Sequence, residues 1–158
     1  MAVKYTEKEL WEYFIKKNQK YINLEVPESF YFCDNKKDAD ELAFLVKNKI
    51  KKGTSSLFYE YERENEELPK ENEMAIVTDY DGNALAIINN VKVELIKFKD
   101  VSEELALKEG EGDKTLDYWR RVHIDFFTRI LKTYDMKFSE EMLIVFEHFE
   151  TVFTTDDI

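Results

Sequence analysis

The run of residues 142–153 constrains the fold most, because it is apolar on both faces of an extended chain. Such a run predicts a central strand that is buried on both sides. Glu147 shares one face of this strand with Leu143, Val145 and Phe149. If that face points inward, the carboxyl is buried and needs a basic partner or a raised pKa.

Apolar residues at helical spacing predict helices in four other places. Thr6 and Glu9 form a capping box at the start of the first, Asp34 or Asp38 can cap the second, and Gly110 stops the third. The predicted helices end near residues 20, 49, 109 and 134, and the last two begin near residues 102 and 115.

Extended runs occupy most of the rest of the chain. Residues 81–83, Asp-Gly-Asn, predict a hairpin because glycine adopts a positive φ without steric cost. Residues 60–73 carry seven acids against two bases and predict an exposed loop. The predicted strands are residues 31–33, 55–62, 74–80, 84–91, 91–98 (after a bend at residues 89–90) and 142–153. We therefore expect one α+β domain with about five or six mostly antiparallel strands.

Composition restricts the class of protein. A chain of 158 residues is about one domain. Its single cysteine, Cys33, can form no intramolecular disulfide and predicts a reducing, cytoplasmic compartment. No apolar run approaches the ~18 residues that span a bilayer, and the N-terminal residues lack the apolar core of a signal peptide, so we expect no membrane partner. The net charge of −11 argues against broad binding of duplex DNA, although a local basic pocket for one nucleotide remains compatible with it.

A basic island is the first candidate for chemistry. Its ammonium groups, beside a glycine and hydroxyls, are suited to hold an anion, but Lys47 and Lys49 are equally explained by the dipole at a helix C-terminus. Lys51 and Thr54 reach one side only if the chain turns at Gly53. The island comprises Lys47, Lys49, Lys51 and Lys52, followed by Gly53, Thr54, Ser55 and Ser56.

The turn at residues 109–113, Glu-Gly-Glu-Gly-Asp, is the second candidate. Carboxylates between glycines suit a metal loop or a general base at a helix end. The spacing departs from that of a calcium loop, so an ordinary helix stop is the simpler reading.

Three basic residues of the long predicted helix are the third candidate. His123 lies four residues from both Trp119 and Phe127, on or beside the apolar stripe, and reads as a structural histidine. Arg120 and Arg121 suit either phosphate or surface ion pairs. The histidines and the single cysteine have no zinc spacing, so the sequence predicts no metal and no cofactor.

These segments, in this order, resemble the ASCH domain family, which has a β-barrel like that of the PUA RNA-binding domain. The similar branch is bacterial and has an N-terminal helical extension. The resemblance covers roughly residues 25–153 and implies an extension, residues 1–24, packed on a domain of residues 25–158. The residues that carry the resemblance are 40–43, 51–54, 56–62, 93–94, 109–113, 116, 118–119, 126–127, 147 and 149.

The signature loop of the family reads Gly-x-Lys-x-x-Thr, and Lys51 and Thr54 match its lysine and last threonine. Lys49 takes the glycine position of this loop, and Lys52 takes the position of a first threonine. Relatives often have a glycine in place of Cys33 as well.

The resemblance also implies a function. The family is described as RNA-associated, and a small branch hydrolyses the acetyl amide of an acetylated cytidine. Its catalytic lysine, threonine and glutamate fall on Lys51, Thr54 and Glu109. Thr54 or a water would attack the amide carbonyl, Glu109 would move protons, and Lys51 would stabilise the developing oxyanion or lower a pKa. The residues expected to contact the RNA, nucleoside or nucleotide are Lys52, Ser55, Tyr59, Arg120, His123 and Glu147.

Two other functions remain open at this point. In a non-catalytic RNA- or nucleotide-binding module, Lys51, Lys52 and Arg120 would hold phosphate while Tyr59 or Trp119 stacks on a base. In a protein-interaction domain, the acidic loop at residues 60–73 would be the binding surface.

Overall fold

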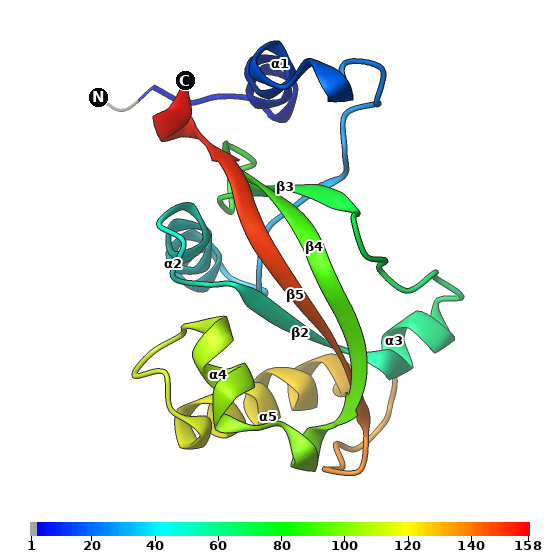
Figure 1. Ribbon diagram of the computed structural model, residues 1–158. Helices are drawn as coiled ribbons and strands as arrows, with labels where there is room; N and C mark the ends of the chain where they lie inside the picture. Colours follow the sequence, from blue (N-terminus) through cyan, green and yellow to red (C-terminus); the bar gives the residue numbers. More distant parts are fainter. Residues whose placement is uncertain (1–2) are drawn as a thin grey trace.

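The computed structural model describes residues 3–158 and has one five-stranded sheet in that range (Figure 1). The order is β1-β3-β4-β5-β2, and only the β1–β3 pair is parallel. The sheet is not closed into a ring: β1 and β2 are its edges, while β4 and β5 form two long, curved strands through its middle. The α+β class with mostly antiparallel strands is confirmed. The strands are β1 Ser29–Phe30, β2 Gly53–Leu57, β3 Met74–Thr78, β4 Ala84–Lys97 and β5 Leu143–Thr154.

Helices cover the sheet at several places. In Figure 1, α1 lies at one end, α2 lies beside β2, and α4 and α5 lie together at the other end. The α-helices are α1 Glu7–Lys17, α2 Lys36–Lys47, α3 Phe58–Arg63, α4 Glu103–Glu109 and α5 Leu116–Lys132. Short 3₁₀ turns are η1 Gln19–Tyr21, η2 Phe98–Asp100 and η3 Thr155–Asp157.

The helix caps follow local chemistry, with one correction. The Thr6–Glu9 capping box of α1 is present, and Gly110 ends α4 in a left-handed conformation with φ 66°. The cap of α2 is neither Asp34 nor Asp38 but Asn35, whose side-chain oxygen accepts from the backbone N–H of Asp38 at 2.9 Å. All these residue types accept such bonds, so only the backbone path between them selects the cap.

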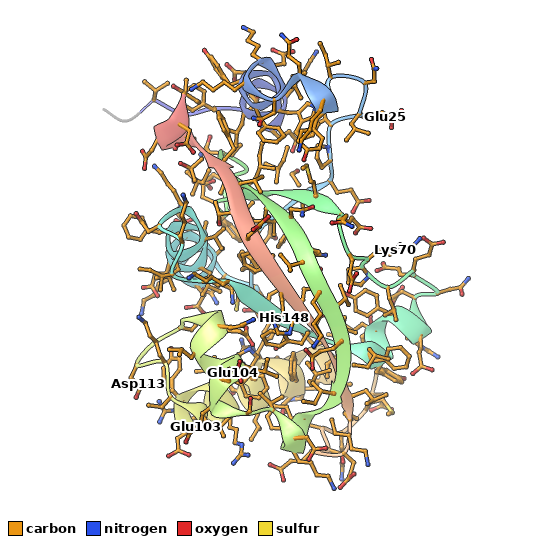
Figure 2. The ribbon with its side chains drawn as sticks, in the orientation of Figure 1. Glu25, Lys70, Glu103, Glu104, Asp113 and His148 are labelled. Carbon is orange, nitrogen blue, oxygen red and sulfur yellow. The ribbon has the colours of Figure 1, made fainter. Side chains whose placement is uncertain are left out.

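The strand predicted at residues 55–62 is wrong in its second half. Leu57 pairs with Ile144, and β5 begins only one residue earlier, at Leu143. Beyond Leu57, β5 therefore offers at most one further residue for backbone pairing. The chain satisfies its next backbone N–H and C=O groups by turning into α3. As a result, Tyr59 and Tyr61 lie on a helix rather than on a strand, and the first part of the predicted acidic loop is helical. The rest of that loop, which carries Lys70, projects from the side of the sheet (Figure 2).

The two extended runs predicted on either side of residue 91 form one strand, β4. Its register with β5 shifts between Asn90 and Lys92, which leaves Val91 unpaired in a bulge. A bulge bends a strand without ending it, so the predicted bend is real but the predicted break is not. The hairpin between β3 and β4 is confirmed, with φ 89° at Gly82.

Strand β5 contributes to all three parts of the hydrophobic core. Ile144 and Phe146 pack with residues of α4 and α5, Phe149 packs with α2, and Phe153 packs with α1. The prediction of a central strand that is buried on both faces is therefore confirmed. Helices α2, α4 and α5 therefore pack around the part of the sheet that contains β2, where the cleft described below lies (Figure 1).

Two predictions about organisation have partial answers. Helix α1 packs on the sheet through Leu10, Trp11 and Phe14. The boundary between an extension and a domain at residues 24 and 25 stays a prediction, and residues 1–2 of that extension lie outside the described part. Within residues 3–158, no helix has the length and apolar character needed to span a membrane.

Candidate functional site

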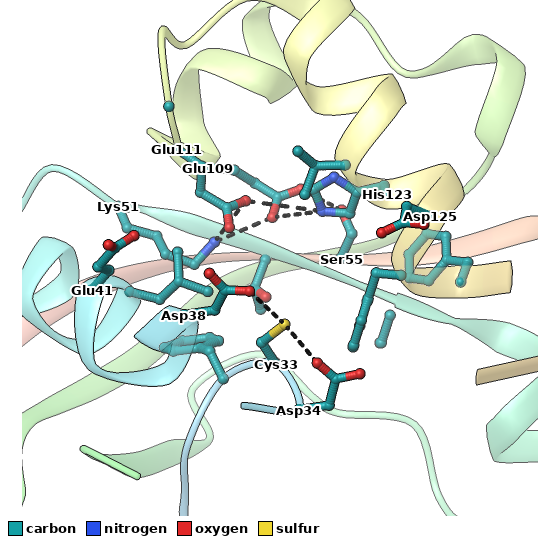
Figure 3. Close-up of a pocket in the computed structure, with 18 of the residues that line it drawn as sticks. Cys33, Asp34, Asp38, Glu41, Lys51, Ser55, Glu109, Glu111, His123 and Asp125 are labelled. Carbon is teal, nitrogen blue, oxygen red and sulfur yellow. Dashed lines mark hydrogen bonds and ion pairs between the residues drawn. The ribbon is translucent and has the colours of Figure 1, made fainter. Parts of the chain in front are cut away.

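A cleft of about 910 Å³ lies between α2, β2, the turn after α4, and α5 (Figure 3). One wall carries Lys51, Glu109, Glu111 and His123, and Cys33, Asp34 and Asp38 lie opposite. Clefts of roughly 300–1,000 Å³ are the usual size of small-molecule sites.

A buried ion pair lies in the first of these walls. The Lys51 Nζ donates to Glu109 Oε1 at 3.2 Å, and each side chain is only 1% exposed. Lys51 reaches this position because Lys49, with φ 61°, ends α2 in a left-handed turn. The backbone N–H groups of Ile50 and Lys51 both donate to the carbonyl of Leu45, which fixes the turn.

Both oxygens of Glu109 are fully engaged. Oε1 accepts from Lys51 and lies 3.4 Å from His123 Nε2, while Oε2 accepts from Ser55 Oγ at 2.6 Å and from the indole N–H of Trp119. A carboxylate offers about four lone-pair sites, so this one is saturated by protein groups.

His123 stacks on Trp119, with ring centroids 4.2 Å apart and an interplanar angle of 17°. Its Nδ1 lies 2.8 Å from the Trp119 carbonyl oxygen, which can only accept, so Nδ1 carries a hydrogen. Its Nε2 faces both carboxylates, at 3.4 Å from Glu109 Oε1 and 3.9 Å from Glu111 Oε2.

The turn after α4 brings the second carboxylate, Glu111, to the same wall. Gly110 and Gly112 flank it and have φ values of 66° and 57°. A Cβ atom at Gly110 would lie 2.6 Å from the Ile50 carbonyl oxygen, and one at Gly112 would lie 2.3 Å from the Tyr118 ring. Glycine is therefore favoured at both positions by the left-handed conformation, and at Gly110 a larger residue would also collide with the backbone. Glu111 Oε2 lies 3.7 Å from Lys51 Nζ.

The two carboxyls have opposite pKa shifts. Burial by itself would raise the pKa of Glu109, but the charges of His123 and Lys51 and the hydrogen bonds it accepts hold it well below its usual range. Burial raises the pKa of Glu111, and the adjacent Glu109 adds to the rise against the effect of Lys51. His123 also has a raised pKa: burial lowers it, but the charge of Glu109 and the hydrogen bond to it outweigh that effect.

Cys33 lines the opposite wall in a left-handed conformation, with φ 66°. Burial raises the pKa of its thiol to about 12, and the charges of Asp34 and Asp38 add to this. The thiol is therefore neutral near pH 7 and is not an activated nucleophile.

Glu109, Glu111 and His123 are the residues whose ligand atoms converge, all within 4.8 Å of one another. Carboxylate and imidazole ligands suit a divalent metal. However, the Lys51 ammonium already lies within 4 Å of both carboxylates, at 3.2 and 3.7 Å, and supplies the positive charge there. We assign no metal to this cluster.

The structure brings some of the predicted site residues together. Lys51, Thr54, Ser55, Glu109 and His123 all line the cleft. The hydroxyl that bonds to Glu109 belongs to Ser55, whereas Thr54 lies one residue away on the same strand. The predicted turn at Gly53 is not seen, since Gly53 begins β2 and pairs with His148.

The other predicted contacts do not line this cleft, and their role stays a prediction. The exposed Lys52 bonds through its backbone to Lys108 and Phe149. The ring of Tyr59 packs edge-on against the ring of Tyr134, and the two ring centroids are 5.7 Å apart. Arg120 lies on α5 with a buried Nε that has no hydrogen-bond partner in the described chain.

Glu147 bonds to Asn90 Nδ2 at 3.1 Å instead of to a basic partner. Burial raises its pKa, as expected for an inward-facing carboxyl.

Sequence reasoning missed Glu111 as an individual site residue. The signal was available in the alternation of carboxylates and glycines at residues 109–113, but spacing alone gave no reason to separate the roles of its two glutamates. Asp38 and Glu41 on α2 and Tyr118 on α5 also line the cleft. Glu41 and Tyr118 are among the residues that carry the family resemblance, whereas the sequence predicts Asp38 only as a possible helix cap.

Comparison with known proteins gives a consistent result. The family model described as ASCH domain matches residues 28–153. A crystal structure of an ASCH domain from Lactobacillus crispatus JV V101 is 31% identical, covers 92% of this chain and 93% of its own, and superposes with a TM-score of 0.87. A crystal structure of a protein from Enterococcus faecalis V583 is 34% identical, with 92% and 86% covered and a TM-score of 0.84. None of the curated proteins matches this chain.

Proposed function

Because the chain belongs to the ASCH domain family, we propose that its cleft hydrolyses an amide bond on a modified nucleoside, of the acetylated-cytidine type. The observation that carries the proposal is the Lys51–Glu109 pair, buried beside strand hydroxyls at the wall of a cleft of small-molecule size. A lysine, a hydroxyl and a glutamate are the three groups that the resemblance implies for this chemistry, and all three line one cleft.

Each group has a role in such a reaction. The ammonium of Lys51, held by Glu109, would stabilise the negative charge that develops on the carbonyl oxygen of the substrate. The hydroxyl of Thr54, or a water, would attack the carbonyl carbon. Ser55 donates its hydroxyl hydrogen to Glu109 at 2.6 Å, but the lowered pKa of Glu109 makes this carboxylate a weak base, so Ser55 is less suited to attack.

The charge of the cleft favours an uncharged or cationic ligand. Seven carboxylate side chains line it, against three from lysine and arginine. Glu41, Glu60 and Asp125 are among the carboxylates, and the bases are Lys51, Arg121 and Arg129. Focused negative potential repels phosphate. A nucleoside therefore fits the site better than a nucleotide or an RNA strand.

Mass spectrometry of products tests this proposal. The purified protein is incubated with a panel of acylated nucleosides, and we expect deacylation by the wild type and a 10²–10³-fold slower rate in Lys51→Ala, on the order expected for loss of an oxyanion-stabilising group. Lys52→Ala is the matched control, since Lys52 is exposed and does not line the cleft.

Two outcomes would decide against hydrolysis. Equal rates in Lys51→Ala and the wild type, with circular dichroism confirming that the variant is folded, would move any activity away from this cleft. Binding of panel members without turnover would leave the non-catalytic binding module as the function.

A further inference from the structure

Glu109 and Glu111 differ in how many of their carboxyl oxygens are already engaged by protein groups. Glu109 has two neighbouring groups at each oxygen, from four different residues. A ligand that bonded to Glu109 would have to displace one of these groups. Its role is therefore to hold Lys51, Ser55 and His123 in place.

Glu111 is in the opposite situation. Its Oε2 is buried and has no hydrogen-bond partner within residues 3–158, although it lies 3.7 Å from Lys51 and 3.9 Å from His123. The side chain is 14% exposed and lines the cleft (Figure 3). A buried polar atom without a partner is costly unless a ligand or water satisfies it.

The backbone makes this arrangement rigid. Gly110 and Gly112 place Glu111 in a turn in which both glycines have a positive φ, and a Cβ atom at Gly110 would lie 2.6 Å from a backbone carbonyl oxygen. The Glu111 side chain lines the cleft, so this turn places its carboxyl where a ligand atom can meet it.

We propose that Glu111, not Glu109, is the carboxyl that meets the ligand and gives a proton to the nitrogen of the scissile amide. The proton-transfer part of this inference depends on the hydrolysis proposed above, whereas the contact with the ligand does not.

The step balances with water as the only co-reactant. When water attacks directly, its oxygen bonds to the carbonyl carbon and the carbon–nitrogen bond breaks. When Thr54 attacks, its oxygen forms an ester as the carbon–nitrogen bond breaks, and water then cleaves the ester and restores the Thr54 hydroxyl. The nitrogen leaves as an amine because it takes the proton of the Glu111 carboxyl. The Glu111 carboxylate then regains a proton from the added water, so that one acid and one amine are released. The raised pKa of Glu111 keeps a larger share of its carboxyl protonated for this role, whereas Glu109 stays ionised.

Carbon-13 NMR of glutamate side-chain carboxyls tests the contact. Comparison of wild type with Glu111→Gln and Glu109→Gln assigns the two resonances, and the acylated nucleosides and their deacylated parents are then titrated into the wild type. We expect the Glu111 resonance to shift with ligand and to titrate at a higher pH than the Glu109 resonance.

Kinetics on the same samples test the proton transfer. If the wild type turns over, Glu111→Gln should slow the reaction about 10²–10⁴-fold and abolish the loss of rate that the wild type shows as Glu111 ionises at higher pH. Glu111→Asp should keep the pH dependence in reduced form, which a purely structural role would not predict.

The results separate this inference from the proposed function. A Glu111 resonance that shifts without any turnover supports the contact and overturns the hydrolysis together with its proton step. Turnover with no ligand-induced shift of the Glu111 resonance, or with an unchanged rate in Glu111→Gln, overturns the inference and leaves the proposed hydrolysis in place. If no nucleoside moves the Glu111 resonance and none is hydrolysed, both are overturned.

Discussion

Lys49 and Cys33 both adopt a left-handed backbone conformation, with φ of 61° and 66°. At both positions the family resemblance implies glycine. A non-glycine residue in this conformation costs about 1–2 kcal/mol. The backbone at both positions therefore has a conformation that favours glycine, although neither residue is a glycine. At Lys49 this path ends α2 and carries Lys51 into the cleft. The substitution therefore changes the local strain but not the position of the site lysine.

We expect the stability of the folded protein to depend on pH through His123. Its pKa is raised above 6.5, with Glu109 and Glu111 facing it and Lys51 beside them. The resulting stabilisation is full below about pH 6.5 and is lost as pH rises through the raised pKa, by about 1.4 kcal/mol for each unit of the shift.

Urea unfolding of the wild type and His123→Gln from pH 5.5 to 9 measures this effect. The difference in the free energy of unfolding between them should be largest at the acid end and decrease as the pH rises. A difference that stays constant across the range would show that His123 is not paired in its charged form.

At the scale of elements, the turn between α4 and α5 does more than connect two helices. Helix α4 ends at Glu109, α5 begins at Leu116, and the backbone between them places Glu111 beside Glu109. The indole of Trp119, on the first turn of α5, then bonds back to Glu109. The two helices and β2 are therefore joined through one buried carboxylate.

Gly110→Ala should destabilise the protein by about 2–4 kcal/mol, because the new Cβ would lie 2.6 Å from a backbone oxygen in addition to the unfavourable φ. Gly82→Ala is the matched control, since Gly82 has φ 89° but no atom within 4 Å of the new Cβ, and it should cost only about 1 kcal/mol. Chemical denaturation measures both. Equal losses would mean that Ile50 moves aside at no cost and that the turn is not rigid.

At the scale of the whole molecule, the charge of the cleft has the same sign as the charge of the chain. The net charge is −11, and carboxylates predominate along the cleft as well as in the loop that carries Lys70. The cleft is therefore not a basic pocket set into an acidic surface, and its long-range field disfavours anionic ligands.

A pair of double variants tests this field. Glu41→Gln with Asp125→Asn removes two charges from the cleft, while Glu67→Gln with Glu71→Gln removes two from the loop. For a nucleoside 5′-monophosphate, the cleft variant should bind about fivefold more tightly than wild type at low salt, and the loop variant should change little. Calorimetry with the monophosphate and its parent nucleoside measures this. A monophosphate that binds the wild type more tightly than the nucleoside would contradict the proposed ligand class.

The features that depend on neighbours along the chain can be predicted from the amino-acid sequence. The Thr6–Glu9 capping box, the Gly110 helix stop and the Gly82 hairpin all arise from interactions within a few residues. The apolar pattern of residues 142–153 likewise predicts burial of β5 on both faces, because alternation along one strand decides which faces are apolar. The α+β class follows from these elements.

The features that depend on distant partners become visible in the folded chain and not in its local patterns. Strand β2 ends at Leu57, one residue before the end of the ladder that β5 offers, because β5 begins at Leu143. Lys51 and Glu109 are 58 residues apart in sequence, and their shared burial makes them a pair. The choice of Ser55 as the partner of Glu109, and the free oxygen left on Glu111, depend on how α4 and α5 pack against β2. Local patterns identify residues capable of chemistry, but burial and convergence are properties of the packed chain.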